Sequence, residues 1–307
     1  MEIIGHAKQR QVLTKMGREG NLPHALLFAG PAKIGKKQVA LELAKSLFCE
    51  AATPPCENCY SCRKINEMAF PDLSIVSVEP ETKEIKIEQI WNLSERLALK
   101  SYGNSYKVGI IDDAHLMNAS AQNALLKTLE EPKGQSLIIL ITNFPDMLLA
   151  TVRSRAQIVK FSLVPKAEIE KHLIKLGAKE DQAKEITILS SGQIGKAIDF
   201  FKDPEKMKLF TRTIKEIEHL CHAGYSERFA YAKQLIDSTE DLDEVLEIWE
   251  RFFRREMLFK ETGNKSKLDY SITGLVAIIR GVERLKYLIN NTNINKKMAL
   301  ENLLINL

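Results

Sequence analysis

A glycine-rich stretch near the N-terminus has the residues of a phosphate-binding loop. In "FAGPAKIGKK" (28–37), Gly30, Gly35 and Lys36 occupy the fixed positions of the pattern G-x-x-x-x-G-K-S/T. In such a loop, backbone N–H groups and a helix N-terminus surround a phosphate, and the lysine contacts it as a point charge. The last position is Lys37, which has no hydroxyl for Mg²⁺. We therefore predict a phosphate-loop fold without turnover, leaving weak nucleotide binding open; the alternative is an ordinary glycine-rich turn.

Two carboxylates follow a second apolar run, in "VGIIDDAHLM" (108–117). Asp112 lies where a nucleotide-hydrolysing enzyme makes a water-bridged contact to Mg²⁺. Asp113 lies where such enzymes usually place a glutamate that polarises the attacking water, and aspartate is one methylene shorter. A displacement of that size can cost orders of magnitude in rate. The pair predicts a nucleotide site that has lost activity; the alternative is that it caps the following helix.

Four of the five cysteines lie in one short polar segment, with the spacing C-x6-C-x2-C-x2-C: Cys49, Cys56, Cys59 and Cys62. Four thiolates complete a tetrahedral shell around Zn²⁺ and leave no position for a substrate, so the pattern predicts a structural zinc site. An iron–sulfur cluster and reduced, buried thiols are the alternatives. Clustered thiols in a chain without a secretion signal favour a metal in a reducing cytosol over disulfides. The fifth cysteine, Cys221, is predicted to be a small core residue.

Short apolar runs alternate with helical patterns in the first half of the chain. The runs are 25–30, 72–78, 107–112, 137–142 and 156–161, and the helical stretches between them include 36–48, 87–99 and 120–131. Continuous apolar character is typical of strands buried on both faces of a parallel sheet. The order of strands and helices predicts an α/β layered domain with right-handed crossovers.

After residues 164–165 the strand pattern ends and only helical patterns follow, with breaks at Gly177 and Gly192. We predict three parts: an α/β nucleotide-binding-like domain (1–164) with the cysteine module at 49–62, a helical lid (165–203) and a helical bundle (204–307). In the bundle, one apolar helical face predicts core and subunit interface: Val245, Ile248, Trp249, Phe252, Phe253, Met257 and Leu258. A neighbouring basic cluster is predicted to be a solvated face and is not assigned to nucleic acid: Arg251, Arg254, Arg255 and Lys260.

Composition narrows the class of protein. The 307 residues are 45% hydrophobic and 27% charged, so the chain can bury a large hydrophobic core. Its net charge is +4, which is too small to indicate nucleic-acid binding by itself. No apolar run is long enough for a secretion signal or a spanning helix. We expect a cytoplasmic protein without a membrane partner.

Two longer stretches carry a resemblance to a known family. "IIDDAHLMNASAQNALLKTLEEP" (110–132) and "ITNFPDMLLATVRSRAQIVKF" (141–161) resemble the clamp-loader branch of the AAA+ ATPases. Together with the cysteine insert, the chain resembles the delta-prime family of bacterial DNA polymerase III subunits. The resemblance implies an AAA+ sheet domain with a zinc-binding insert, a lid and a C-terminal collar that assembles a ring. It also implies gamma/tau and delta subunits as partners, and contact with the sliding clamp and primed DNA through the complex.

The resemblance also assigns roles to single residues. Ser154-Arg155-Ala156 matches the family's Ser-Arg-Cys segment except for the cysteine, which implies that Arg155 is an arginine finger for the ATP site of the adjoining subunit. A guanidinium offered in this way contributes roughly 10³–10⁵ in rate; the alternative is an ordinary surface arginine. Asn143 matches the sensor-1 position, and Gly195 stands where active loaders carry the sensor-2 arginine.

These residues predict a catalytically silent clamp-loader subunit that lends Arg155 to a neighbour and carries structural zinc. One alternative is an active, gamma-type ATP-hydrolysing motor that uses ATP and Mg²⁺, motivated by Gly30, Gly35, Lys36 and Asp112. Another is a stand-alone AAA+ regulator.

Overall fold

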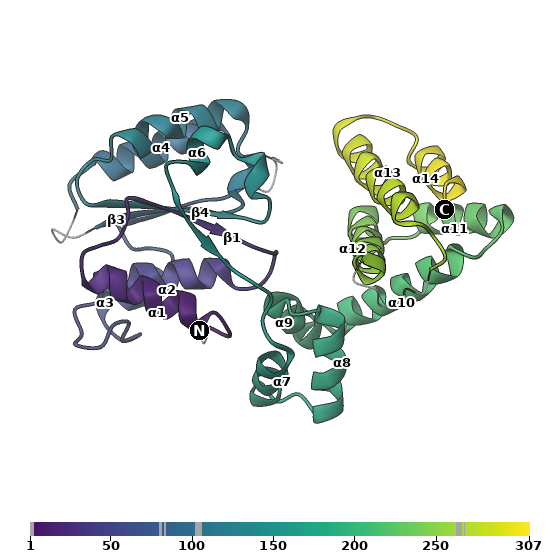
Figure 1. The fold of residues 1–307 in the computed structure, drawn as a ribbon, viewed down its shortest axis with the longest axis horizontal. Coiled ribbons are helices and arrows are strands. Elements are labelled where there is room, and N and C mark those ends of the chain that lie inside the picture. Colours follow the sequence, from purple (N-terminus) through teal and green to yellow (C-terminus); the bar gives the residue numbers. More distant parts are fainter. Residues whose placement is uncertain (1–2, 80–81, 83, 102–105, 262–265, 267) are drawn as a thin grey trace. The chain divides into compact units, whose positions relative to one another are not determined.

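The computed structural model describes residues 3–79, 82, 84–101, 106–261, 266 and 268–307, with 290 and 291 described by their backbone alone. The chain divides into two compact units, residues 1–201 and 202–307 (Figure 1). The predicted boundary between a sheet domain and a lid falls inside the first unit and stays a prediction.

A five-stranded parallel sheet forms the centre of the first unit, with the strand order β2-β3-β4-β1-β5. Its strands are β1 (Ala25–Ala29), β2 (Leu73–Val76), β3 (Lys107–Ile111), β4 (Ser136–Thr142) and β5 (Gln157–Lys160). The five predicted strands are therefore confirmed. The expectation that all of them are buried on both faces is wrong for β5, where Gln157, Ile158 and Lys160 are exposed. The reason is its position at the edge of the sheet, beside β1.

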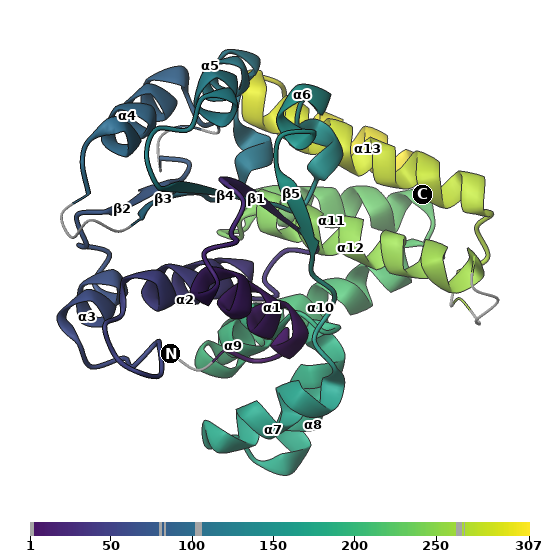
Figure 2. The same cartoon turned by 60° about the vertical axis from the view of Figure 1, so that its left-hand side comes forward.

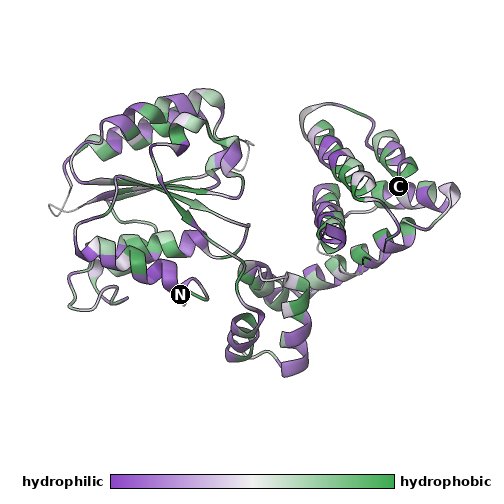
Figure 3. Cartoon of the chain, viewed as in Figure 1, coloured by the Kyte–Doolittle hydropathy of each residue, from purple (hydrophilic) through white to green (hydrophobic). Residues whose placement is uncertain are grey.

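Helices cover both faces of this sheet, as Figures 1 and 2 show. One face carries α1 (Ala7–Arg18), α2 (Lys36–Phe48) and α3 (Tyr60–Asn66), and the other carries α4 (Ile87–Ala98), α5 (Ala119–Glu130) and α6 (Ala150–Arg153). Alternate residues of β1 serve the two layers: Leu26 and Phe28 pack with Val39 of α2, whereas Leu27 packs with Leu125 of α5. The central strands β1 and β4 are accordingly largely hydrophobic in Figure 3.

Three short helices complete the first unit: α7 (Lys166–Lys175), α8 (Glu180–Ser190) and α9 (Ile194–Lys202). The predicted breaks at Gly177 and Gly192 separate them. A backbone hydrogen bond also joins this region to the segment that follows β5, since the N–H of Val164 donates to the carbonyl of Gly192 over 2.9 Å.

The second unit is helical: α10 (Pro204–Leu220), α11 (Tyr225–Asp237), α12 (Leu242–Glu261), α13 (Ile272–Asn291) and α14 (Lys296–Ile305). Of the predicted apolar face of α12, Trp249, Phe252 and Phe253 belong to the core of this unit with Val245, and Met257 packs against it. Ile248 is also buried, at 6% exposure. Leu258 lies outside this core and is 52% exposed. Cys221 is buried in the same core, as predicted.

Three of the four basic residues of α12 in the predicted solvated face pair with acids: Arg251 with Glu247, Arg254 with Glu283 and Arg255 with Glu256. Among the residues that the structure describes, no helix combines the length and the apolar character needed to cross a bilayer.

Candidate functional site

The phosphate loop lies at the edge of the sheet where the parallel strands end. Gly30 follows β1, Asp112 follows β3 and Asn143 follows β4, and these three strands are neighbours in the order β3-β4-β1. Carboxyl ends of adjacent parallel strands form the usual ligand crevice of such sheets. The fold therefore brings together the residues that the sequence placed in a nucleotide site.

The loop turns into α2 at Gly35, which has φ 101° and stands at the N-cap of the helix. This left-handed conformation favours glycine, because a residue with a Cβ atom would be strained at this φ. The first turn of α2 then carries Lys36 and Lys37 side by side. The local geometry is thus that of a strand–loop–helix phosphate site.

The Lys36 ammonium is fully engaged by the protein itself. Its Nζ donates to the carbonyl of Gly30 over 2.7 Å, to the carbonyl of Pro31 over 2.6 Å and to Oδ1 of Asn143 over 2.7 Å. An ammonium has three N–H donors, so these bonds use all of them. Lys36 is 5% exposed, and burial lowers its pKa to about 8, although the Asp113 carboxylate acts in the opposite direction. A phosphate would have to replace partners that already satisfy this lysine.

Lys37 supplies a fixed positive charge in the region where a metal ion is needed. Its Nζ lies 3.0 Å from Oδ2 of Asp112, the carboxylate expected to hold Mg²⁺. The lysine thus offers no hydroxyl for Mg²⁺, and it pairs the carboxylate predicted to contact Mg²⁺ through water with an ammonium. Chemically, the site neutralises its own carboxylate without a metal.

Asp113 lies beside this pair and is half-buried, in a left-handed conformation with φ 48°. Burial raises its pKa, and repulsion from Asp112 acts in the same direction. The alternative that these aspartates cap the next helix is not supported: Asp113 is the N-cap of the 3-10 turn Ala114–Leu116, and its side chain makes no capping hydrogen bond. The positive charges of Lys36 and Lys37 act in the opposite direction and lower the pKa of Asp113.

The start of helix α9 contacts the phosphate loop directly. The N–H of Gly195 donates to the carbonyl of Lys33 over 2.7 Å, and Nε2 of Gln193 donates to the carbonyl of Ala32 over 3.1 Å. Nζ of Lys33 reaches back to Oδ2 of Asp199 at 2.7 Å. A Cβ at position 195 would lie 3.0 Å from the Lys33 carbonyl oxygen and 3.2 Å from its Cβ. Glycine is therefore what permits this close approach, a reason that the sequence alone did not reveal.

Lys196 follows Gly195 in α9 and packs against a ring of the same helix. Its Nζ lies over the ring of Phe200, 5.2 Å from the centroid, and its side chain is buried.

Arg155 lies just beyond α6 and is 35% exposed at its side chain. One terminal nitrogen lies 2.6 Å from Oε1 of Glu130, and the other donates to the carbonyl of Thr151 over 3.0 Å. Ala156, where the family pattern has cysteine, is buried in the core beneath α5 and α6. The sequence indicated Arg155 but not Glu130, because the two are 25 residues apart and only the packing of α5 and α6 brings them together.

The strand register places Arg155 near the N-terminal ends of the parallel strands, whereas the phosphate loop lies at their C-terminal ends. Leu26 pairs with Gln157 and Ala29 with Lys160 in parallel β1 and β5. Arg155 precedes the start of β5, whereas Gly30 follows the end of β1. From the level of Leu26 to Gly30 there are four residues of strand, at least about 13 Å. The guanidinium is therefore displaced from the nucleotide site of its own chain.

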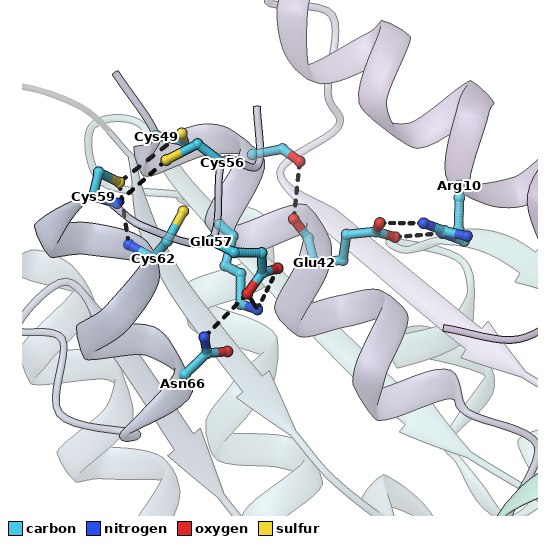
Figure 4. Close-up of polar contacts among 10 residues, drawn as sticks. Arg10, Glu42, Cys49, Cys56, Glu57, Cys59, Cys62 and Asn66 are labelled. Carbon is cyan, nitrogen blue, oxygen red and sulfur yellow. Dashed lines mark hydrogen bonds and ion pairs between the residues drawn. The ribbon is translucent and has the colours of Figure 1, made fainter. Parts of the chain in front are cut away.

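The four clustered cysteines come together at the end of α2 (Figure 4). Their Sγ atoms all lie within 4.8 Å of one another, and the Sγ atoms of Cys49 and Cys59 are 4.0 Å apart. Ligands at a Zn–S distance of about 2.3 Å in a tetrahedron are about 3.8 Å apart, so the cluster is close to the size of a single-ion site. Backbone N–H groups, first that of Asn58, lower the pKa of Cys56 to about 6. The four thiols can hold a metal ion.

An ion pair ties this module to α2. Nζ of Lys45 lies 2.8 Å from both carboxylate oxygens of Glu57, and Asn66 of α3 donates to the same carboxylate over 3.1 Å (Figure 4). Lys45 is 6% exposed, and Cys49 directly follows α2. The helix that begins at the phosphate loop thus ends at the cysteine module.

Comparison with known proteins agrees with this architecture. Residues 5–165 match the family described as "DNA polymerase III, delta subunit". The chain is 34% identical to the DNA polymerase III delta-prime subunit of Bacillus subtilis over 258 residues, which cover 81% of this chain and 76% of that protein. The chain belongs to the family of DNA polymerase III delta-prime subunits.

A second member of the delta-prime family, from Pseudomonas aeruginosa, is 34% identical over 149 residues, covering 48% of this chain and 45% of that protein. The solved structure of a DNA polymerase III gamma-subunit-related protein from Thermotoga maritima aligns with a TM-score of 0.57 at 20% identity, covering 97% of each chain. This likeness shows that the two proteins share a fold.

Proposed function

We propose that this chain is a subunit of the DNA polymerase III clamp loader that does not itself hydrolyse ATP and lends Arg155 to the ATP site of an adjoining subunit. Gamma/tau and delta subunits are its proposed partners, and through their complex it supports loading of the sliding clamp onto primed DNA. Residues 204–307 serve as the collar that joins the ring, and residues 165–203 serve as the lid. The cytoplasm is the proposed location, since no described helix could span a membrane.

The position of Arg155 in the sheet is the observation that carries the trans role. Its guanidinium is partly exposed, and the residue lies near the N-terminal ends of the strands, whereas the phosphate loop of the same chain lies at their C-terminal ends. In that place it cannot stabilise charge on a phosphate bound at Gly30 or Lys36, but it can meet a phosphate presented by another subunit. A guanidinium is suited to this task because it is planar, permanently charged and rich in N–H donors.

The internal bonds of the phosphate loop support a silent site. Lys36 already donates to three oxygens of the chain, and Lys37 neutralises Asp112. Nucleotide binding with Mg²⁺ would require breaking these contacts and placing a divalent cation close to an ammonium. The competing proposal, a gamma-type motor, draws on the convergence of Gly30, Lys36, Asp112 and Asn143 at one edge of the sheet, but it has to overcome the same contacts.

ATP turnover separates these proposals. The purified chain alone is expected to show no Mg²⁺-dependent hydrolysis, whereas the complex reconstituted with gamma/tau and delta subunits hydrolyses ATP. In that complex, Arg155→Ala is expected to reduce turnover without changing assembly, as judged by size-exclusion chromatography with light scattering. Arg153→Ala is the matched control, because Arg153 is a neighbouring arginine that pairs with Asp146 over 2.5 Å. Unaided hydrolysis that Lys36→Ala abolishes would establish the motor, and normal turnover in the Arg155→Ala complex would remove the finger role.

Zinc is the metal that we propose for the cysteine cluster. Four thiolates on a single ion fill its coordination shell, so the metal would fold the module and would bind no substrate. An iron–sulfur cluster holds its thiolates further apart, since several iron and sulfide atoms lie between them. Elemental analysis of protein purified without chelator tests this, with about one zinc per chain expected; iron with sulfide, or no metal at all, would contradict it.

A further inference from the structure

The side chain of Arg155 is held in place by the rest of its own chain. An arginine on a surface ordinarily samples many rotamers, and holding it in one of them costs side-chain entropy. Here the guanidinium forms an ion pair with the Glu130 carboxylate at 2.6 Å and donates a hydrogen bond to the Thr151 carbonyl over 3.0 Å. These contacts direct the group before any partner arrives.

The two elements that provide this grip are themselves fixed. Gln122 of α5 is buried and accepts the N–H of Leu149 over 2.7 Å, while its Nε2 donates to the carbonyl of Met147 over 3.4 Å. These bonds tie α5 to the segment that leads into α6. Leu125 and Leu129 anchor α5 in the core, so Glu130, the last residue of this helix, is presented from a rigid support.

We infer that Glu130 is a positioning residue for Arg155, which keeps the guanidinium oriented toward the nucleoside triphosphate of the adjoining subunit. This inference rests on the proposed function of Arg155. A guanidinium has five N–H donors, and the pairing with Glu130 and Thr151 uses one on each terminal nitrogen, so the same group keeps donors for a phosphate. Glu130 does not touch the nucleotide; it acts through Arg155.

The consequence is an effect on the rate of the chemical step. A finger that has lost its orientation still reaches the phosphate in some rotamers, so the Glu130→Gln complex should bind ATP normally and turn it over more slowly. We expect kcat to fall about two- to tenfold, because the Arg155–Glu130 pair is only partly buried and the hydrogen bond from Arg155 to the Thr151 carbonyl remains. KM should stay within about twofold of the wild-type value.

The neighbouring residue Glu131 provides a matched control. Glu131→Gln makes the same change in charge and shape one position away, and no ion pair of Glu131 is found among the described residues. Steady-state ATP hydrolysis would be measured in the reconstituted complex with primed DNA and sliding clamp for wild type, Glu130→Gln, Glu131→Gln, Arg155→Ala and the double variant Glu130→Gln/Arg155→Ala. Thermal unfolding of each chain would be followed in parallel.

A double-mutant cycle then distinguishes positioning from mere stabilisation. If Glu130 acts through Arg155, Glu130→Gln lowers kcat in the wild-type background and has no further effect in the Arg155→Ala background, while Glu131→Gln is silent in both. If Glu130→Gln leaves kcat unchanged, or lowers it equally in both backgrounds, the inference is overturned and the finger role of Arg155 stands. If Arg155→Ala itself has no effect, the proposed function fails and the inference falls with it.

Discussion

Replacing Lys37 by threonine restores the hydroxyl that a magnesium-binding phosphate loop requires. In the structure, the Lys37 ammonium lies 3.0 Å from Asp112, and both side chains are partly exposed. Loss of such a pair should cost only about 0.2–1 kcal/mol of stability. Lys37→Thr should therefore fold, which can be checked by circular dichroism and urea unfolding.

The effect on a metal ion should be much larger than the effect on stability. A Mg²⁺ ion held by Asp112 would lie about 4 Å from an ammonium in the position of Lys37, where repulsion amounts to about 8 kcal/mol at an effective dielectric of 20. This value is a ceiling, because a lysine that is 36% exposed can turn toward water. Even a fifth of it corresponds to about a tenfold change in affinity.

A fluorescent ATP analogue, titrated against the isolated chain with Mg²⁺ or with EDTA, provides the assay. For Lys37→Thr, Mg²⁺ should tighten binding by at least about tenfold, whereas wild type should change by less than about twofold. Lys37→Met removes the charge without supplying a hydroxyl, so its gain should lie between these two. Equal dependence on Mg²⁺ in wild type and Lys37→Thr would refute the reasoning that Lys37 excludes the metal.

Three further predictions concern the same unit. Chelation of the metal, or Cys62→Ser, should lower the melting temperature of the chain and increase protease cleavage within 49–66. An unchanged melting temperature after verified metal removal would argue against a structural role of the metal. Gly195→Arg should destabilise the chain by about 1–3 kcal/mol in urea unfolding, since the added Cβ would lie 3.0 Å from the carbonyl oxygen of Lys33. An unchanged free energy of unfolding would mean that α9 can move away from Lys33 without loss of stability. Burial lowers the pKa of Lys36 from 10.5 to about 8, so the unfolded state binds more protons than the folded state between these pH values. The free energy of unfolding of wild type relative to Lys36→Met should therefore rise as the pH increases from 8 to 10.5. A fall over this range would contradict the burial of the ammonium.

The sequence alone was sufficient for the strands, the main helices and the motif residues, because these depend on local spacing. The run 137–142 is apolar at every position except Thr142, which is typical of a strand buried on both faces, and β4 lies between β3 and β1 in the sheet. The same reasoning was wrong for β5, since apolar character by itself does not tell an edge strand from a central one. The cysteine spacing likewise predicted a cluster whose sulfurs do converge.

What only the tertiary structure decided is which partner each charged side chain takes. Lys37 meets Asp112 across 75 positions, Gly195 meets Lys33 across 162, and Arg155 meets Glu130 through the packing of two helices. The sequence shows Lys37 and Gly195 at positions where active loaders are expected to carry a hydroxyl residue and an arginine. The structure adds that Lys37 pairs with Asp112 and that the N–H of Gly195 donates to the carbonyl of Lys33. Side-chain pairing depends on how distant segments pack in three dimensions, whereas local periodicity carries only the information of residues close along the chain.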